Sequence, residues 1–90
     1  ELLQHLDSKQ VLKGIATSSI RKDALLCLGE LANQFDVIVT GDEVKNGKPA
    51  PDIYLLAASR LGLLSDECLV LEDSEFGAKA ALAAGIKVVI

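Results

Sequence analysis

The chain has 90 residues, half of them hydrophobic but only 3% aromatic, and its 13 acidic and 9 basic side chains give a formal net charge of −4. A chain of this length forms at most one small domain, with a core built from Leu, Ile, Val and Ala. The acidic balance, without aromatic residues among basic ones, argues against a nucleic-acid surface, and no apolar run approaches the ~20 residues of a membrane span.

The first two predicted strands are each followed by a helix. Residues 1–10 have helically spaced leucines and no preceding cap, so we expect the tail of a helix that begins upstream. Residues 11–17 predict a strand, and Ser18 or Ser19 could cap the helix that follows. One face of this helix would carry Ala24, Leu25, Leu28, Leu31 and Ala32. Residues 36–40 predict the second strand, which is followed by a polar loop.

The remainder of the chain repeats this pattern. A helix is predicted from Pro51 to about Leu61, with proline at its first position. The apolar run 68–72 predicts a third strand. It is followed by a helix from Glu75 to Ala84, capped by Ser74 and closed by Gly85, and by a final strand over 86–90.

Four apolar strands alternating with three helices predict a Rossmann-like α/β fold, a doubly wound parallel sheet covered on both faces. The two cysteines, Cys27 in a helix and Cys68 at a strand start, are expected to be buried thiols rather than a disulfide. With no signal peptide, we expect a cytoplasmic protein without membrane or nucleic-acid partners.

Polar residues follow the strands at the edge where ligands bind in this fold class. Thr17, Ser18 and Ser19 follow the first strand, beside helix amides that suit an anion, although simple helix capping also explains one of them. Lys48 lies between a flexible Gly47 and a stiff Pro-Ala-Pro segment, which suggests placement, although a solvent-exposed loop lysine is the ordinary alternative. A hydroxyl cluster and a lysine fit a phosphate group.

Glu72 and Asp73 are adjacent carboxylates at the end of a buried strand. Their mutual repulsion calls for a cation, and Mg²⁺ is held by one or two carboxylates, water and phosphate oxygens. Because neighbouring side chains of a strand point in opposite directions, one acid would bind directly and the other through a second contact. We expect Asp73 to be the nearer ligand. Gly77, in the next helix, predicts close backbone packing.

The motifs "GKPAPDIY" and "LEDSEFG", preceded by a hydroxyl after a strand, resemble the haloacid dehalogenase-like hydrolase superfamily. The resemblance is strongest to its β-phosphoglucomutase and phosphoglycolate phosphatase-like branch, over about Val11 to Ile90. It implies a phosphate-binding hydroxyl at Thr17, a charge-neutralising lysine at Lys48 and magnesium carboxylates at Glu72 and Asp73. It also implies a small phosphorylated metabolite as substrate and an aspartyl-phosphate intermediate.

The sequence departs from that family's pattern in one respect. The family's nucleophilic aspartate belongs to a DxDGT motif after a first, central strand, and these ninety residues contain no such motif. The helical cap that selects the substrate is also absent. We therefore interpret residues 1–90 as a single partial core domain, with 1–10 the tail of a preceding helix and 11–90 the carboxyl-terminal strands and helices, inactive alone. Its unpaired inner strand edges would bind the missing amino-terminal segment or self-associate.

Three alternatives remain. The parent protein could be a phosphomutase of the β-phosphoglucomutase type instead of a hydrolase. The chain could also be a non-catalytic module of the same fold that binds phosphate, metal or protein. A receiver-like signalling domain has similar residues, but there the lysine follows the later strands, so the order found here disfavours it.

Overall fold

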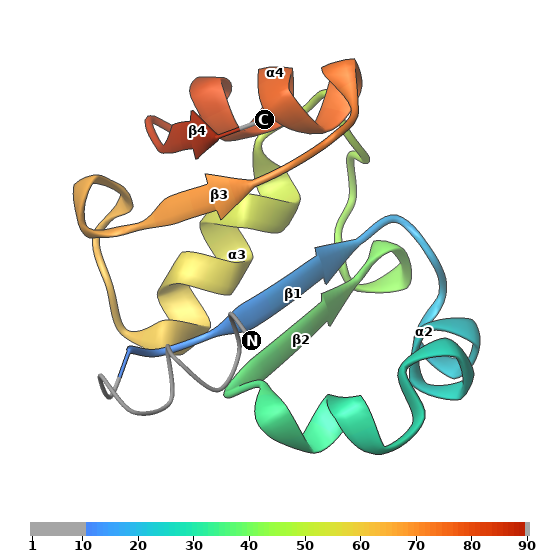
Figure 1. The fold of residues 1–90 in the computed structure, drawn as a ribbon. Helices are drawn as coiled ribbons and strands as arrows, with labels where there is room; N and C mark the ends of the chain where they lie inside the picture. The colour runs from blue at the N-terminus through green and yellow to red at the C-terminus, as the bar shows by residue number, and fades with distance from the viewer. Residues whose placement is uncertain (1–10, 90) are drawn as a thin grey trace.

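The structure, a computed structural model, describes residues 11–89, and the helix expected at residues 1–10 lies outside this range. Within it, strands and helices alternate as predicted (Figure 1). In chain order they are β1 (Gly14–Thr17), α2 (Arg21–Leu28), β2 (Val37–Thr40), α3 (Asp52–Leu61), β3 (Leu69–Leu71), α4 (Glu75–Ala83) and β4 (Lys87–Val89). Short 3-10 turns occupy Gly29–Gln34, Gly41–Glu43 and Ser65–Glu67.

The strands form two parallel pairs. β1 pairs with β2, with Thr17 opposite Thr40, and β3 pairs with β4, with Leu71 opposite Val89. The arrowheads of β1, β2 and β3 point to the same side of the molecule, so their carboxyl ends share one edge (Figure 1). Within the described residues β1 and β3 belong to separate sheets. This arrangement agrees with the expected lack of a central strand.

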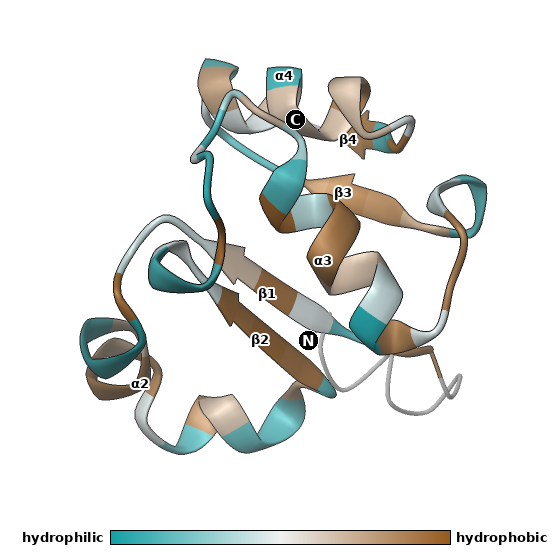
Figure 2. Cartoon of the chain, turned by 180° about the vertical axis from the view of Figure 1, so that it is seen from behind, coloured by the Kyte–Doolittle hydropathy of each residue, from teal (hydrophilic) through white to brown (hydrophobic). Residues whose placement is uncertain are grey.

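The core lies between the strands and the helices α3 and α4. It consists of Val39, Ile53, Tyr54, Ala57, Ala80, Ala81, Ala84 and Ile86. The strands β1, β2 and β3 are mostly hydrophobic along their length, whereas the loop before α3 is largely hydrophilic (Figure 2). Small alanines on α3 and α4 allow these helices to approach one another and the strands closely. No helix among residues 11–89 is long and apolar enough to cross a membrane.

One face of the β3–β4 pair remains open. Val70 and Val88 point to the core, but Leu69, Leu71 and Val89 are 59%, 58% and 49% exposed. The prediction that both faces are covered is therefore not met here by any part of residues 11–89. The sheet presents an apolar surface instead.

The helix predicted after the first strand differs most from expectation. Neither serine caps α2, because Ile20 is its N-cap residue and makes no side-chain capping bond. The serine backbone packs against the end of β2 instead, where the Gly41 amide donates to the Ser19 carbonyl at 2.8 Å. A Cβ at Gly41 would lie 2.2 Å from the Ser18 carbonyl oxygen, so this contact requires glycine.

The helix is also shorter than predicted. It stops at Leu28 because Gly29 has a positive φ of 55°, and a 3-10 turn replaces the predicted last turns. Only Ala24 is buried in α2, while Leu25 and Leu31 are 40% and 48% exposed, so the predicted continuous apolar face is wrong. Cys27 is exposed on this helix, against the prediction of a buried thiol, and Cys68 is half-buried.

Candidate functional site

The Lys48 side chain reaches from the loop before α3 to the end of β1. Its Nζ donates to the Ala16 carbonyl at 3.2 Å and to Oε2 of Glu72 at 3.1 Å. The amine also lies 5.0 Å from the centre of the Tyr54 ring, and the side chain is only 13% exposed. Ala16 directly precedes Thr17, so the structure brings the lysine from the loop to the strand end where the sequence predicts a phosphate site.

Glu72 occupies the centre of this arrangement. Its Oε2 accepts hydrogen bonds from Lys48 and from the Tyr54 hydroxyl, the latter at 2.7 Å. Its Oε1 accepts from the backbone amides of Asp73 and Ser74, both at 3.1 Å, and from the Ser74 hydroxyl at 3.2 Å. Five donors therefore surround one carboxylate that is 12% exposed. This carboxylate is fixed at both oxygens.

These contacts decide the protonation state of Glu72. Burial alone would raise its pKa, but the hydrogen bonds from Tyr54, Lys48 and Ser74 outweigh burial and lower the pKa from 4.5 to about 2. Burial, followed by the bond to Glu72, raises the pKa of Tyr54 well above its usual 10. At neutral pH the group is therefore an ionised carboxylate held by a neutral phenol and an ammonium.

Gly77 provides the space for this carboxylate. A Cβ at Gly77 would lie 2.0 Å from Oε2 and 2.1 Å from Cδ of Glu72. The Gly77 amide donates to the Ser74 hydroxyl at 3.0 Å, which confirms Ser74 as the cap of α4. The predicted close packing at Gly77 is thus a contact with the Glu72 side chain rather than with the strands themselves.

Asp73 differs from its neighbour. It is exposed, and its carboxylate accepts no hydrogen bond and forms no ion pair with any residue between 11 and 89. A solvated carboxylate at a strand end suits a hard cation that retains water ligands. Within the described part of the chain, no three His, Cys, Asp or Glu side chains gather to hold a metal. Asp73 therefore offers one ligand, and Glu72 has its oxygens occupied.

The hydroxyls after β1 are less organised. Thr17 Oγ1 accepts from the Ser19 amide at 3.2 Å, and Ser18 and Ser19 are exposed. The Thr17 side chain is half-buried next to the carbonyl that holds Lys48. These residues lie at the expected edge, but within residues 11–89 they form no hydrogen bond with Lys48, Glu72 or Asp73.

A second charged cluster holds the helices at the end of β2. Glu43 accepts from Arg21 at 3.0 Å and from Arg60 at 2.5 Å, which links α2 to α3. Arg21 also donates to the Ile38 carbonyl at 3.0 Å. A hydrogen bond from Thr40 lowers the pKa of Asp42. These charged groups pair with one another, so the cluster stabilises the packing of α2 and α3 rather than the strand-end site.

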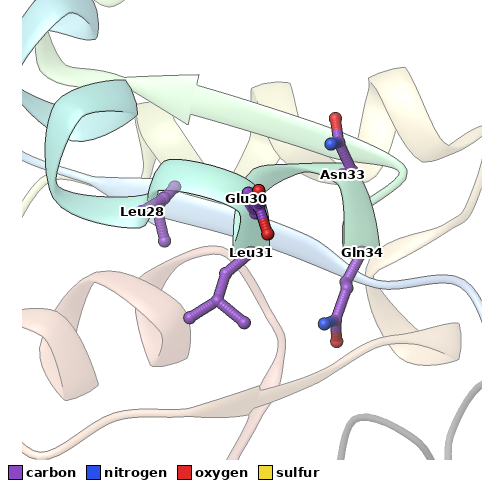
Figure 3. Close-up of a pocket in the computed structure, with 5 residues that line it drawn as sticks. All are labelled: Leu28, Glu30, Leu31, Asn33 and Gln34. Carbon is purple, nitrogen blue, oxygen red and sulfur yellow. The ribbon is translucent and has the colours of Figure 1, made fainter.

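Two of the open hollows formed by residues 11–89 lie in different places. One, of about 640 Å³, lies at the end of α2 and in the following 3-10 turn and is lined by Leu28, Glu30, Leu31, Asn33 and Gln34 (Figure 3), none of which is a predicted site residue. The other, of about 430 Å³, is lined by Leu71, Glu72, Asp73 and Val89. The second hollow adjoins the acid pair, at the open side of β3.

The contact of Tyr54 with the candidate site was not predicted from the sequence. This residue is the single tyrosine of the chain and lies in the first turn of α3, three residues after Pro51. Its position in an apolar helical stripe predicts a core residue, and its ring is indeed buried. The signal was its hydroxyl, because a buried phenol requires a partner and the nearest strand ends in carboxylates.

Sequence comparison with known proteins matches this chain to one family and to named phosphatases. The chain matches the haloacid dehalogenase-like hydrolase family over residues 1–90. A phosphorylated carbohydrates phosphatase of Thermotoga maritima is 45% identical over 89 residues, covering 97% of this chain and 41% of that protein. A fructose-1-phosphate phosphatase of Escherichia coli is 45% identical over 76 residues, covering 84% of this chain and 40% of that protein.

Solved structures show the same fold. A β-phosphoglucomutase from Clostridium difficile superposes with a TM-score of 0.89 at 30% identity, covering 97% of this chain and 39% of that one. CbbY from Rhodobacter sphaeroides, in complex with phosphate, superposes with a TM-score of 0.91 at 30% identity, covering 97% of this chain and 41% of that one. The chain thus spans about two fifths of the length of each of these four proteins.

Proposed function

The chain belongs to the haloacid dehalogenase-like hydrolase family, and from this we propose that it is the carboxyl-terminal part of the catalytic core of a phosphatase. The substrate class we propose is a small phosphorylated carbohydrate. Support comes from the relatives named as a phosphorylated carbohydrates phosphatase and a fructose-1-phosphate phosphatase. The observation that carries the proposal is the placement of Lys48.

Lys48 would neutralise charge on the phosphoryl group. Its amine is held at the end of β1 by the Ala16 carbonyl and Glu72 instead of moving freely in solvent. Phosphoryl transfer depends mostly on positioning and on stabilising charge spread over the phosphate oxygens, and a preorganised ammonium does both. Thr17 and Ser18, at the same strand end, would donate hydrogen bonds to those oxygens.

Asp73 would hold Mg²⁺. Its carboxylate is exposed and has no hydrogen-bond partner among residues 11–89, whereas five donors surround Glu72. When bound, Mg²⁺ would neutralise charge on the phosphate and orient it for in-line attack. Glu72 would act one step away, by fixing Lys48 and, through its bonds to the 73–74 amides, the backbone that carries Asp73.

The nucleophile lies outside the ninety residues under this proposal. The family pattern forms an aspartyl-phosphate on the first aspartate of a DxDGT motif, which this sequence lacks. The chain alone would therefore bind Mg²⁺ weakly and turn over no substrate. Its contribution is the lysine, the hydroxyls and one metal ligand.

A phosphomutase is the second candidate. The observation that favours it is the likeness to a solved β-phosphoglucomutase over 97% of this chain. Both reactions would use the same Lys48 and Asp73, because they differ in whether water or a sugar hydroxyl accepts the phosphoryl group. Product analysis separates them: hydrolysis releases inorganic phosphate, and a mutase returns an isomeric sugar phosphate.

The test is a substrate panel with the protein of natural length. Fructose 1-phosphate and other hexose and polyol phosphates are assayed for phosphate release with and without Mg²⁺. We expect turnover only with Mg²⁺ and a loss of at least 100-fold in Asp73→Asn, with Asp66→Asn, an exposed acid elsewhere, as control. Equal activity in Asp73→Asn and wild type would contradict the proposal.

A further inference from the structure

Tyr54 combines a buried ring with a polar contact to the candidate site. The residue is 7% exposed, and its ring belongs to the core between the strands and helices α3 and α4. Its hydroxyl donates to Oε2 of Glu72 at 2.7 Å, the oxygen that also accepts from Lys48 at 3.1 Å. Packing alone would need only the ring, so the hydroxyl requires its own explanation.

We propose that Tyr54 is a positioning residue, whose hydroxyl holds the Glu72 carboxylate so that Lys48 stays at the carboxyl end of β1. The inference rests on the proposed role of Lys48 in binding the phosphoryl group. It adds a residue from helix α3 to a site otherwise made of the ends of β1 and β3 and the loop before α3.

Tyr54 is itself held in place through its backbone and its ring. Its amide donates to the Pro51 carbonyl at 3.1 Å, which fixes the first turn of α3, and core residues enclose its ring. On the other side, the backbone amides of Asp73 and Ser74 hold Oε1 of Glu72. The carboxylate is therefore held between a helix and a turn. Lysine has a long, flexible side chain, so its amine needs such a fixed partner.

The hydroxyl also sets how strongly Glu72 attracts Lys48. Two donors share Oε2, so part of its negative charge is directed to the phenol. Without the hydroxyl, Glu72 would draw the amine toward itself and away from the Ala16 carbonyl, which leaves it worse placed for an incoming phosphate. The phenol remains protonated because burial and the neighbouring carboxylate raise its pKa.

Tyr54→Phe isolates this contribution, because it keeps the ring in the core and beneath the Lys48 amine but removes the hydroxyl. In the protein of natural length we expect kcat/KM to fall about tenfold and the inhibition constant of inorganic phosphate to rise about fivefold. The Mg²⁺ activation constant should stay within about twofold, because the substitution leaves the bonds from the Asp73 and Ser74 amides to Oε1 of Glu72 in place. Leu55→Ala, on the exposed side of the same helix, is the control and should match wild type.

Two results would overturn the inference. One is a Tyr54→Phe protein with wild-type kcat/KM and phosphate inhibition. The other is an equal weakening of phosphate and Mg²⁺ binding, because that would indicate general loosening of the fold instead of positioning of Lys48.

A readout independent of catalysis separates this inference from the proposed function. Crystal structures of the wild type and of Tyr54→Phe give the position of the Lys48 amine directly. If the wild type has no phosphatase activity, the proposed function fails, and the crystal structures still decide the role of Tyr54. Loss of the Lys48 bond to Ala16 only in the variant supports positioning, and an unmoved amine refutes it.

Discussion

Gly77 illustrates how one absent side chain defines the site. Its own helix would be more stable with alanine by about 1 kcal/mol, yet a Cβ would lie 2.0 Å from Oε2 of Glu72. Glu72 cannot move away without losing its contacts to Tyr54 and Lys48. Glycine at this position therefore makes room for the carboxylate at a cost to the helix.

We predict that Gly77→Ala displaces the Glu72 carboxylate and lowers the proposed phosphatase activity of the natural-length protein at least tenfold. The free energy of unfolding should fall by about 1–2 kcal/mol, because the lost hydrogen bonds exceed the helix-propensity gain. Steady-state kinetics and urea unfolding measure both effects. Gly47→Ala is the control, since nothing lies within 4 Å of its added Cβ. Full activity in Gly77→Ala would contradict the account.

The ionised state of Glu72 leads to a pH prediction for the natural-length protein in Mg²⁺-free buffer. The folded pKa of about 2 lies below the ordinary 4.5, so the folded state binds its proton less readily than the unfolded state. The stabilisation is therefore complete above pH ~4.5 and is lost as pH falls toward ~2. Thermal unfolding should show this loss, and Glu72→Gln should flatten it. Parallel curves for the two proteins would argue against the assignment.

Elements were predictable in type and less so at their ends. The strands β2 and β3 and the helices α3 and α4 appear where apolar runs and capping residues place them, because burial and capping are local signals. Ser18 and Ser19 failed as caps because their backbone is engaged by Gly41, a residue more than twenty positions away. Gly29 by itself indicates a possible end of the helix, but the apolar pattern continues to Leu31 and predicts a longer helix.

The candidate site, too, was only partly predictable from the sequence. Strand ends in a parallel sheet share one edge, so the approach of Lys48 to Glu72 could be predicted from topology alone. Topology alone does not show which of the two acids accepts hydrogen bonds and which has none. That depends on Tyr54, which reaches Glu72 from α3, and on the turn at Ser74. Contacts between elements, unlike their order, require the folded geometry.

The Arg21–Glu43–Arg60 cluster makes a prediction for the packing of α2 and α3. The two arginine side chains are 47% and 43% exposed, so solvent screens the attraction. We expect Glu43→Gln to lower the free energy of unfolding by about 1 kcal/mol at low salt and by less at about 1 M salt. Urea unfolding at both salt concentrations measures the difference, and Glu75→Gln, in an exposed helical pair, is the matched control. A salt-independent loss would point to packing instead of charge.

At the scale of the whole molecule, residues 11–89 leave two kinds of strand surface without a partner among themselves. The β1–β2 and β3–β4 pairs are separate, and Leu69, Leu71 and Val89 form an exposed apolar face on β3–β4. Unpaired parallel strand edges and a bare apolar face both favour association with another chain segment. The same surfaces border the strand end that carries the acid pair.

We therefore predict that the ninety residues alone self-associate or unfold over a broad temperature range. Sedimentation velocity at increasing protein concentration should show a rising sedimentation coefficient, which Leu71→Lys should reduce. Calorimetry gives the second measurement. A concentration-independent monomer with a sharp two-state transition would mean that the sheet is completed in another way.

Under the proposed function, Lys48 is a fixed positive charge at the strand end of a phosphatase site. The most direct test of this claim is the rate of phosphate release from fructose 1-phosphate or the best sugar phosphate by the natural-length protein, compared between wild type, Lys48→Met and the exposed loop variant Lys45→Met. The account predicts a loss of at least 100-fold, about 3 kcal/mol of transition-state stabilisation, in Lys48→Met and wild-type rates in Lys45→Met. Wild-type turnover by Lys48→Met would contradict it.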